Sequence, residues 1–78
     1  MDKRDYGNRG VVWMDGRRRV ATIRRTTGAG LGWMVHWQDR EPYVNDGPIA
    51  TGARNACKWF RKKGDAVESV EQILRLEN

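Results

Sequence analysis

Few residues in this sequence have the chemistry for catalysis or metal binding. His36 is the only histidine and Cys57 is the only cysteine. A catalytic histidine needs a nucleophile or a positioned substrate within hydrogen-bonding reach, and the residues around His36 indicate neither. Cys57 lies on the apolar stripe of a predicted helix, which is typical of a buried structural thiol. One histidine and one cysteine cannot build a nitrogen–sulfur metal site in a monomer, so we expect a non-enzymatic protein without metal or cofactor.

Two loops contain residue types that occur in ligand sites, but their spacing indicates turns. Asp39, Glu41 and Asp46 carry carboxylates, yet the twelve-residue calcium pattern with its central glycine is absent. The glycine-rich run 28–32 lacks the Gly-Lys-Ser/Thr ending of a phosphate loop and connects two predicted strands. Neither loop predicts a bound ligand.

Clustered arginines around aromatic residues form the strongest chemical pattern. Eleven of the fifteen cations are arginine, which forms paired hydrogen bonds to phosphate and stacks on bases. Six arginines and one acidic residue lie between Arg9 and Arg25, and a second basic cluster lies at 58–63. Such clusters are typical of a surface that binds a polyanion. The candidate nucleic-acid-binding residues are Trp13, Arg17, Arg18, Arg19, Arg24, Arg25, His36, Lys62 and Lys63.

Length and composition predict one small domain that positions these residues. The chain has 78 residues, a formal net charge of +5 and four tryptophans, which is too short for two cores but rich in large apolar side chains. We predict a polar N-terminal lead-in at 1–9 and a single domain at 10–78. The lone cysteine, the polar N-terminus and the lack of a long apolar run predict a cytoplasmic protein without disulfide or membrane span.

A β-hairpin is predicted to carry most of the arginines. The β-type residues at 10–14 are followed by Asp15-Gly16, a dipeptide typical of two-residue turns with positive φ, and a second strand at 17–25. This turn would place Met14 opposite Arg17.

Alternation of side chains then divides the hairpin into two faces. We expect the face that carries Ile23, Val12 and Arg19 to be the core face. The other face would display Trp13 among arginines.

The remainder of the chain predicts one more strand and helical segments. The strand at 31–37 alternates well, which predicts a core side made of Leu31, Trp33, Val35 and Trp37. A turn-rich segment at 38–48 contains a candidate short strand at 43–44.

A helix is predicted at 51–63 from an apolar stripe that includes Cys57 and Phe60, with Trp59 wrapping it onto the sheet. Gly64 is the expected residue after its C-terminus. An extended piece at 65–68 and a short helix starting at Ser69 with a capping box, and ending at Leu76, would follow. The predicted fold is therefore α+β: a three- to four-stranded antiparallel sheet packed against one main helix, plus a short C-terminal helix or strand.

Two families of small β domains are similar to parts of the chain. The runs Val12-Trp13-x-Asp15-Gly16-Arg17, Val20-Ala21-Thr22-Ile23 and Val35-His36-Trp37-x-Asp39 resemble the first three strands of Tudor or agenet-type barrels. That resemblance implies binding of methylated or basic peptides in an aromatic cage, but arginines stand where the cage would be. The same strands followed by a helix resemble the sheet-reading domains of integrase arm-binding and plant ethylene-response type, which implies insertion of a three-stranded sheet into the DNA major groove. Both resemblances cover about residues 10–63.

The pattern favours non-enzymatic nucleic-acid binding through the Arg-rich hairpin, with DNA preferred to RNA. In one binding mode the hairpin would enter a DNA major groove, where arginines contact phosphates and guanine edges. In the alternative mode Trp13 and His36 would stack on unpaired bases. The alternative is a small protein-binding module or inhibitor, encoded by a virus or mobile element, that docks on an acidic surface of a host protein or nucleoprotein complex. A third explanation is that the arginines solvate an exposed sheet and prevent edge-to-edge aggregation. A homodimer formed through an exposed sheet face is also open.

Overall fold

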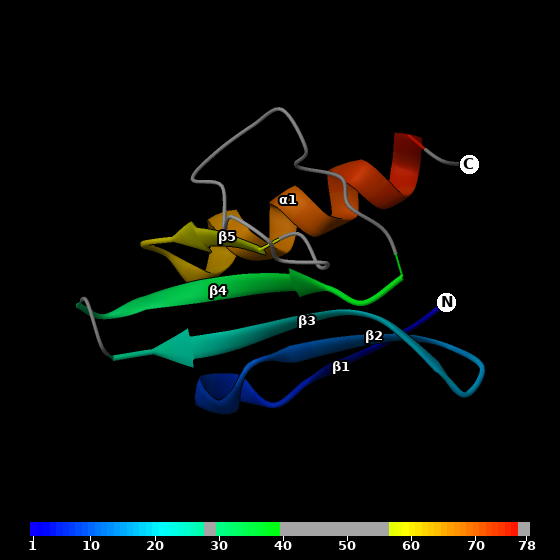
Figure 1. Ribbon diagram of the computed structural model, residues 1–78, viewed down its shortest axis with the longest axis horizontal. Coiled ribbons are helices and arrows are strands. Elements are labelled where there is room, and N and C mark those ends of the chain that lie inside the picture. The colour runs from blue at the N-terminus through cyan, green and yellow to red at the C-terminus, as the bar shows by residue number, and fades with distance from the viewer. Residues whose placement is uncertain (28–29, 40–56, 77–78) are drawn as a thin grey trace.

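A computed structural model describes residues 1–27, 30–39 and 57–76 of the chain. These residues form one antiparallel sheet with strand order β1-β2-β3-β4-β5 and a helix packed against it (Figure 1). The α+β architecture is confirmed, and the sheet has five strands where three to four were predicted. The elements are β1 (Asp2–Asp5), the 3-10 helix η1 (Gly7–Arg9), β2 (Val11–Asp15), β3 (Arg18–Thr26), β4 (Gly32–Trp37), β5 (Cys57–Phe60) and α1 (Lys63–Leu76).

The two edge strands of the sheet, β1 and β5, were not predicted from the sequence pattern. The polar residues Asp2–Asp5, predicted to belong to a lead-in, form β1 beside β2. Their charged side chains obscure any alternation, but charges are common on edge strands because they discourage pairing with other chains. The strands β1 and β5 are not neighbours, so the described strands do not close into the barrel that the Tudor or agenet resemblance implies.

The helix prediction at 51–63 is wrong over its described part. Cys57–Phe60 form β5, which pairs with β4 and places Phe60 opposite Trp33. Two apolar residues three apart match a helical stripe, but the neighbouring aromatics Trp59 and Phe60 also suit a strand. Residues 51–56 and the candidate strand at 43–44 lie outside the described residues.

The α-helix α1 starts earlier than the capping box predicts. It begins at Lys63, so Gly64 lies in its first turn and Ser69 lies in its middle. The predicted extended piece at 65–68 is therefore helical, whereas the predicted end at Leu76 agrees with the structure. Ala66 and Val70 are four residues apart and share one buried side of α1, which drives the helix onto the sheet.

The core lies between α1 and one face of the sheet. The helix packs over β3, β4 and β5 (Figure 1), and Trp37 is completely buried beneath it, as the alternation of β4 predicts. Leu31, predicted on the same core side, is 65% exposed because it precedes the first paired residue of β4. The buried hydrophobic residues are Val11, Trp13, Val20, Ala21, Ile23, Val35, Trp37, Ala66 and Val70.

Trp13 belongs to this core and not to an exposed face as predicted. Its side chain is 3% exposed, and the ammonium of Lys3 lies over its ring at 5.8 Å from the centroid. The prediction failed because a β-bulge in β3 places Trp13 opposite Ala21 and on the same face as Ile23. The turn also differs from the predicted one: Asp15 pairs with Arg18, so the two-residue turn is Gly16-Arg17 and only its glycine has a positive φ.

A β-bulge at Val20 shifts the register of β3. Trp13 pairs with Ala21 and Met14 pairs with Arg19, so Val20 is an extra residue on β3. Val20 and Ala21 are both fully buried, which is the pattern expected when two residues of a bulged strand oppose one residue of its partner. The backbone carbonyl of Val20 accepts a hydrogen bond of 3.0 Å from the backbone N–H of Gln38.

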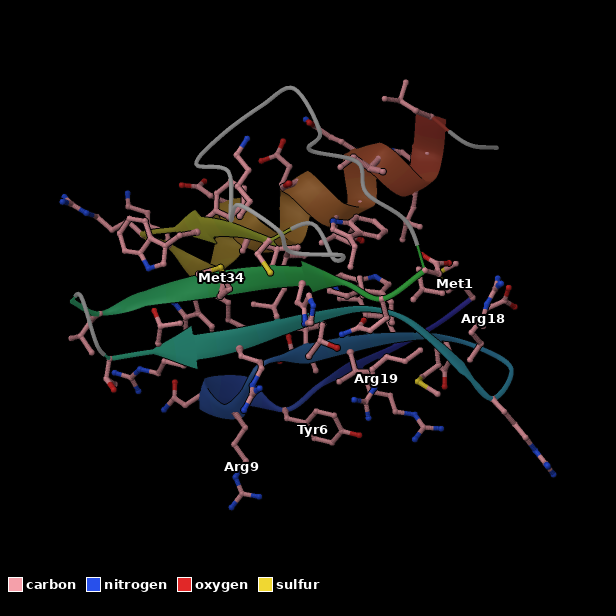
Figure 2. All side chains as sticks on the ribbon, in the orientation of Figure 1. Met1, Tyr6, Arg9, Arg18, Arg19 and Met34 are labelled. Carbon is pink, nitrogen blue, oxygen red and sulfur yellow. The ribbon has the colours of Figure 1, made fainter. Side chains whose placement is uncertain are left out.

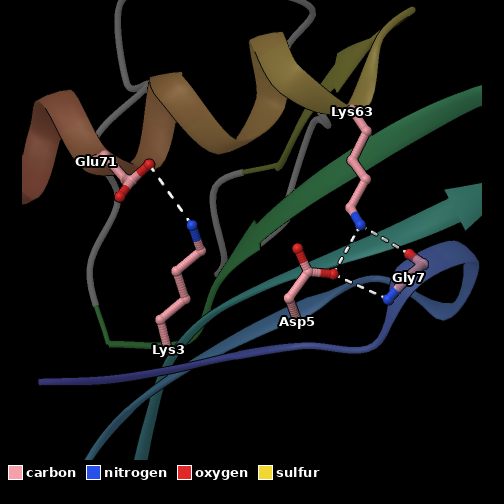
Figure 3. Close-up of polar contacts among 5 residues, drawn as sticks. All are labelled: Lys3, Asp5, Gly7, Lys63 and Glu71. Atoms are coloured by element: carbon pink, nitrogen blue, oxygen red, sulfur yellow. Dashed lines mark hydrogen bonds and ion pairs between the residues drawn. The ribbon is translucent and has the colours of Figure 1, made fainter.

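Ion pairs attach the edge strand β1 to the helix (Figure 3). Lys63 Nζ donates to Asp5 Oδ1 at 2.7 Å and to the carbonyl of Gly7 at 2.9 Å, and Lys3 lies 3.8 Å from Glu71. The hydrogen bond from Lys63 and a second from the backbone N–H of Gly7 lower the pKa of Asp5.

Gly10 joins η1 to β2 in a conformation that other residues rarely adopt. Its φ is +117°, and a Cβ at this position would collide with the backbone carbonyl of Ile23. A glycine is required here because the two backbone segments approach so closely.

Candidate nucleic-acid interface

The sheet has a second face, opposite α1, which we call the open face. Side chains alternate along each strand, and directly paired residues share a face. The registers therefore assign to the open face Asp2, Arg4, Val12, Met14, Arg19, Thr22, Arg24, Thr26, Gly32, Met34, His36, Cys57 and Trp59. The helix α1 lies on the other face, where Val70 and Ala66 join the core.

Two arginines of the open face are exposed and make no ion pair within the described ranges. Arg19 pairs with Met14 and Arg24 pairs with Met34, so both guanidinium groups belong to this face. Arg17 lies at the adjacent turn and is also exposed. These three cations are positioned for anions from outside the protein.

The bulge is what brings Arg19 and Arg24 to one face. Without an extra residue, two positions five apart in a strand would lie on opposite faces. Val20 adds one residue to β3, so Arg19 joins Thr22 and Arg24. The predicted grouping, which placed Arg19 with Ile23, is therefore wrong.

Arg4 contributes a cation whose charge is partly balanced. Its Nε donates to Asp2 Oδ2 at 3.2 Å across two exposed side chains. The hydrogen bond to Asp2 and a second one to Tyr6 raise the pKa of Arg4. Among the open-face residues that the registers assign, Asp2 is the one acidic residue.

The neighbouring arginines Arg18 and Arg25 are directed elsewhere. Figure 2 shows Arg18 and Arg19 pointing in different directions from the start of β3. Arg18 lies 3.2 Å from Asp15 and 3.9 Å from Asp39 in ion pairs. Arg25 pairs with Trp33, which places it on the helix-bearing face.

Trp59 lies on the open face. The sequence pattern had predicted instead that it would wrap a helix onto the sheet. It is 40% exposed, and its Nε1 donates a hydrogen bond of 3.2 Å to the hydroxyl of Thr26 on β3. The indole crosses β4 over Gly32, where any Cβ would overlap the ring. A glycine inside an alternating strand is the one sequence signal that could have indicated this close approach.

Arg24, Met34 and Trp59 form a row across three adjacent strands. Arg24 pairs with Met34, and Met34 pairs with Trp59. The row therefore places a cation that has no ion pair among the described residues on the same surface as a flat aromatic ring, with Met34 between them in the strand pairing. This juxtaposition was absent from the predicted site because Trp59 was assigned to a helix.

His36 lies beside that row in a short chain of polar contacts. Its Nδ1 lies 3.4 Å from Gln38 Nε2, and the Thr22 hydroxyl lies 3.4 Å from Gln38 Oε1. All three side chains are half-buried. His36 therefore lies on the open face as predicted, but its ring is engaged with the neighbouring amide.

The two predicted lysines do not join the open face. Lys63 is held by Asp5 and Gly7, and its ammonium lies 5.6 Å from the centroid of the Trp33 ring on the helix-bearing side. Lys62 is exposed immediately before α1. Of the predicted site, the structure therefore brings together Arg19, Arg24 and His36, with Arg17 at the turn.

A groove between β1 and α1 is a concave feature of the described surface. It encloses about 390 Å³ and is lined by both signs of charge. Its lysines are paired with Asp5 and Glu71, so the groove presents no excess charge to a ligand. The remaining charged residues that line it are Glu68 and Arg75.

The described residues offer little for covalent or metal chemistry. No group of three or more histidine, cysteine or acidic residues within these ranges is arranged to hold a metal ion. Burial raises the pKa of the half-buried Cys57 thiol, which lowers its thiolate fraction. No helix in the described part of the chain is long and apolar enough to cross a membrane.

No family model, curated protein or solved structure matches the chain. What the open face can bind therefore follows from its geometry and charge.

Proposed function

We propose that the protein binds nucleic acid without chemical turnover, through the open face and the adjacent turn. One observation carries the proposal: Arg19 and Arg24, which make no ion pair with any described residue, lie on the same face as the exposed ring of Trp59. Arginine suits phosphate because its planar guanidinium donates several hydrogen bonds, and indole rings stack on bases. Together they match the phosphate and the base of a nucleotide.

The distribution of acids supports this choice of face. The described acids of α1 are Asp65, Glu68 and Glu71, and all lie in the layer behind the sheet. Arg19 and Arg24 therefore face solvent on the side away from these carboxylates, and the exposed Arg17 lies at the adjacent turn. A polyanion that approaches the open face would meet an excess of positive charge.

Binding of labelled oligonucleotides at low and high salt tests the proposal. Fluorescence anisotropy would follow a duplex and a single strand of about twelve nucleotides, DNA first and then RNA, at about 20 and about 200 mM KCl. We expect saturable binding that weakens as salt rises, because phosphate contacts release counterions. Absence of binding to every oligonucleotide at the lower salt would overturn the proposal and direct attention to an acidic protein surface.

A further inference from the structure

We propose that the open face binds single-stranded nucleic acid, with an unpaired base stacked on Trp59 and a neighbouring phosphate held by Arg24. This inference rests on the proposed function and specifies the form of its ligand. The structural basis is the row Arg24–Met34–Trp59 together with the position of the indole over Gly32.

The Trp59 ring is fixed in place before any ligand binds. Gly32 lies against the ring, and the hydrogen bond from Nε1 to Thr26 fixes its direction. The side chain is still 40% exposed although its polar atom already has a partner. An exposed ring held in one orientation loses little conformational freedom on binding, so it can act as a stacking platform.

Arg24 is at a suitable separation from this platform. The two residues lie on β3 and β5, two strand spacings or about 10 Å apart at the backbone. An arginine side chain and the sugar of one nucleotide together span this separation. Arg24 has no carboxylate partner among the described residues, so its guanidinium is available for the phosphate next to the stacked base.

The width of the sheet argues against a duplex on the same surface. Five strands at about 4.8 Å spacing form a face roughly 19 Å wide, whereas the B-DNA major groove is about 12 Å wide. The three-stranded insertion implied by the integrase-type resemblance would therefore not seat this whole face. Bases are also stacked on each other inside a duplex, so Trp59 could reach a base face only at an end or in a loop.

Matched oligonucleotides separate stacking from charge with the unmodified protein. Thymidine and abasic DNA strands of about twelve positions carry the same number of phosphates, and a duplex of equal length completes the set. We expect the thymidine strand to bind roughly 5- to 150-fold more tightly than the abasic strand, the range for stacking of one base. Equal affinities for the thymidine and abasic strands would overturn the stacking while leaving the proposed function intact. Tighter binding to the duplex than to the thymidine strand would likewise overturn the preference for single strands. Absence of binding to all three would overturn both.

Variants of Trp59 assign the effect to this residue. Trp59→Leu keeps an apolar cover on Gly32 and is expected to remove the preference for thymidine over abasic DNA. Trp59→Phe keeps a ring and should retain a clear preference. Trp33→Phe changes a tryptophan on the helix-bearing face and should leave the preference unchanged. Loss of the preference in Trp33→Phe, or its survival in Trp59→Leu, would contradict the assignment.

The same comparison made with ribo-oligonucleotides identifies the polymer. Both DNA and RNA single strands present an unpaired base next to a phosphate, which is the chemistry that the row recognises. A preference for base-containing over abasic strands in either polymer supports the stacking. The polymer with the lower dissociation constant is then the source of the ligand.

Discussion

Replacing Arg19 and Arg24 by glutamine should weaken nucleic-acid binding far more than replacing their neighbours Arg18 and Arg25. Each double variant removes two charges, so both proteins have a formal net charge of +3 instead of +5. The pairs differ in geometry: Arg19 and Arg24 belong to the open face, whereas Arg18 is ion-paired and Arg25 lies on the helix-bearing side. Any difference between the variants therefore reports the face and not the total charge.

The expected magnitude follows from the number of available cations. Three exposed arginines, at positions 17, 19 and 24, lie at the turn or on the open face without a described ion pair. For a single strand each phosphate contact contributes about −0.7 to the log–log salt slope, which gives roughly −2 for the unmodified protein. Arg19→Gln/Arg24→Gln should reduce the slope to about −0.7. If the two proteins bind equally at 1 M salt, this difference of about 1.4 in slope corresponds to about 25-fold weaker binding of the variant at 0.1 M.

Anisotropy titrations at several salt concentrations measure both quantities, with circular dichroism as the check on folding. Glutamine keeps most of the aliphatic stem, and the Arg18 side chain is 62% exposed in both of its ion pairs, which limits what they contribute to stability. Arg18→Gln/Arg25→Gln should therefore fold and keep a slope near −2. Equal losses of affinity and slope in the two variants would refute the reasoning, because they would show a response to net charge without regard to the face.

Three further predictions concern stability and reactivity. Gly10→Ala should destabilise the fold by at least about 2 kcal/mol in urea denaturation, since it adds strain and a backbone collision. Gly64→Ala, in open space within α1, should instead stabilise by about 0.5–1 kcal/mol; a similar loss in both variants would contradict the distinction. The pKa of Asp5 is lowered by Lys63, so its stabilisation is complete above the unfolded value of about 3.9 and is lost as pH falls through the lowered pKa. Melting temperatures of Asp5→Asn should therefore change less between neutral and acidic pH than those of the unmodified protein, and parallel curves would count against this role. Because burial raises the pKa of Cys57, its alkylation near pH 8 should be slower than that of a small free thiol, and an equal rate would be inconsistent with burial.

The success of the sequence predictions depended on how far the local pattern determined the partner of each segment. The alternation of β4 correctly identified Trp37 as core, because a strand with one apolar side has a single way to bury it. The segment Cys57–Phe60 was assigned to the wrong element because four residues fit a helical stripe and a strand equally well. Asp2–Asp5 have no apolar alternation, and they become a strand through pairing with β2.

In the candidate site, too, residue type and clustering predicted some members, whereas strand pairing decided the others. Arg17, Arg19, Arg24 and His36 were predicted from residue type and clustering, and the structure places them on the open face or at its turn. Trp13 was predicted at the site because a regular hairpin would expose it, yet the observed register buries it. Trp59 was missed because its place over Gly32 depends on the pairing of β5 with β4.

The sequence by itself determined the strong positive charge, the excess of arginine over lysine and the presence of a hairpin near Gly16. These properties are local, since they depend on composition or on neighbouring residues. Only the tertiary structure decided which arginines act together and which tryptophan they accompany. The physical reason is that side-chain direction in a sheet reverses with every residue, so the single bulge at Val20 moves Arg19 from one face to the other. Long-range pairing then brings Trp59 to the same face, 35 residues along the chain from Arg24.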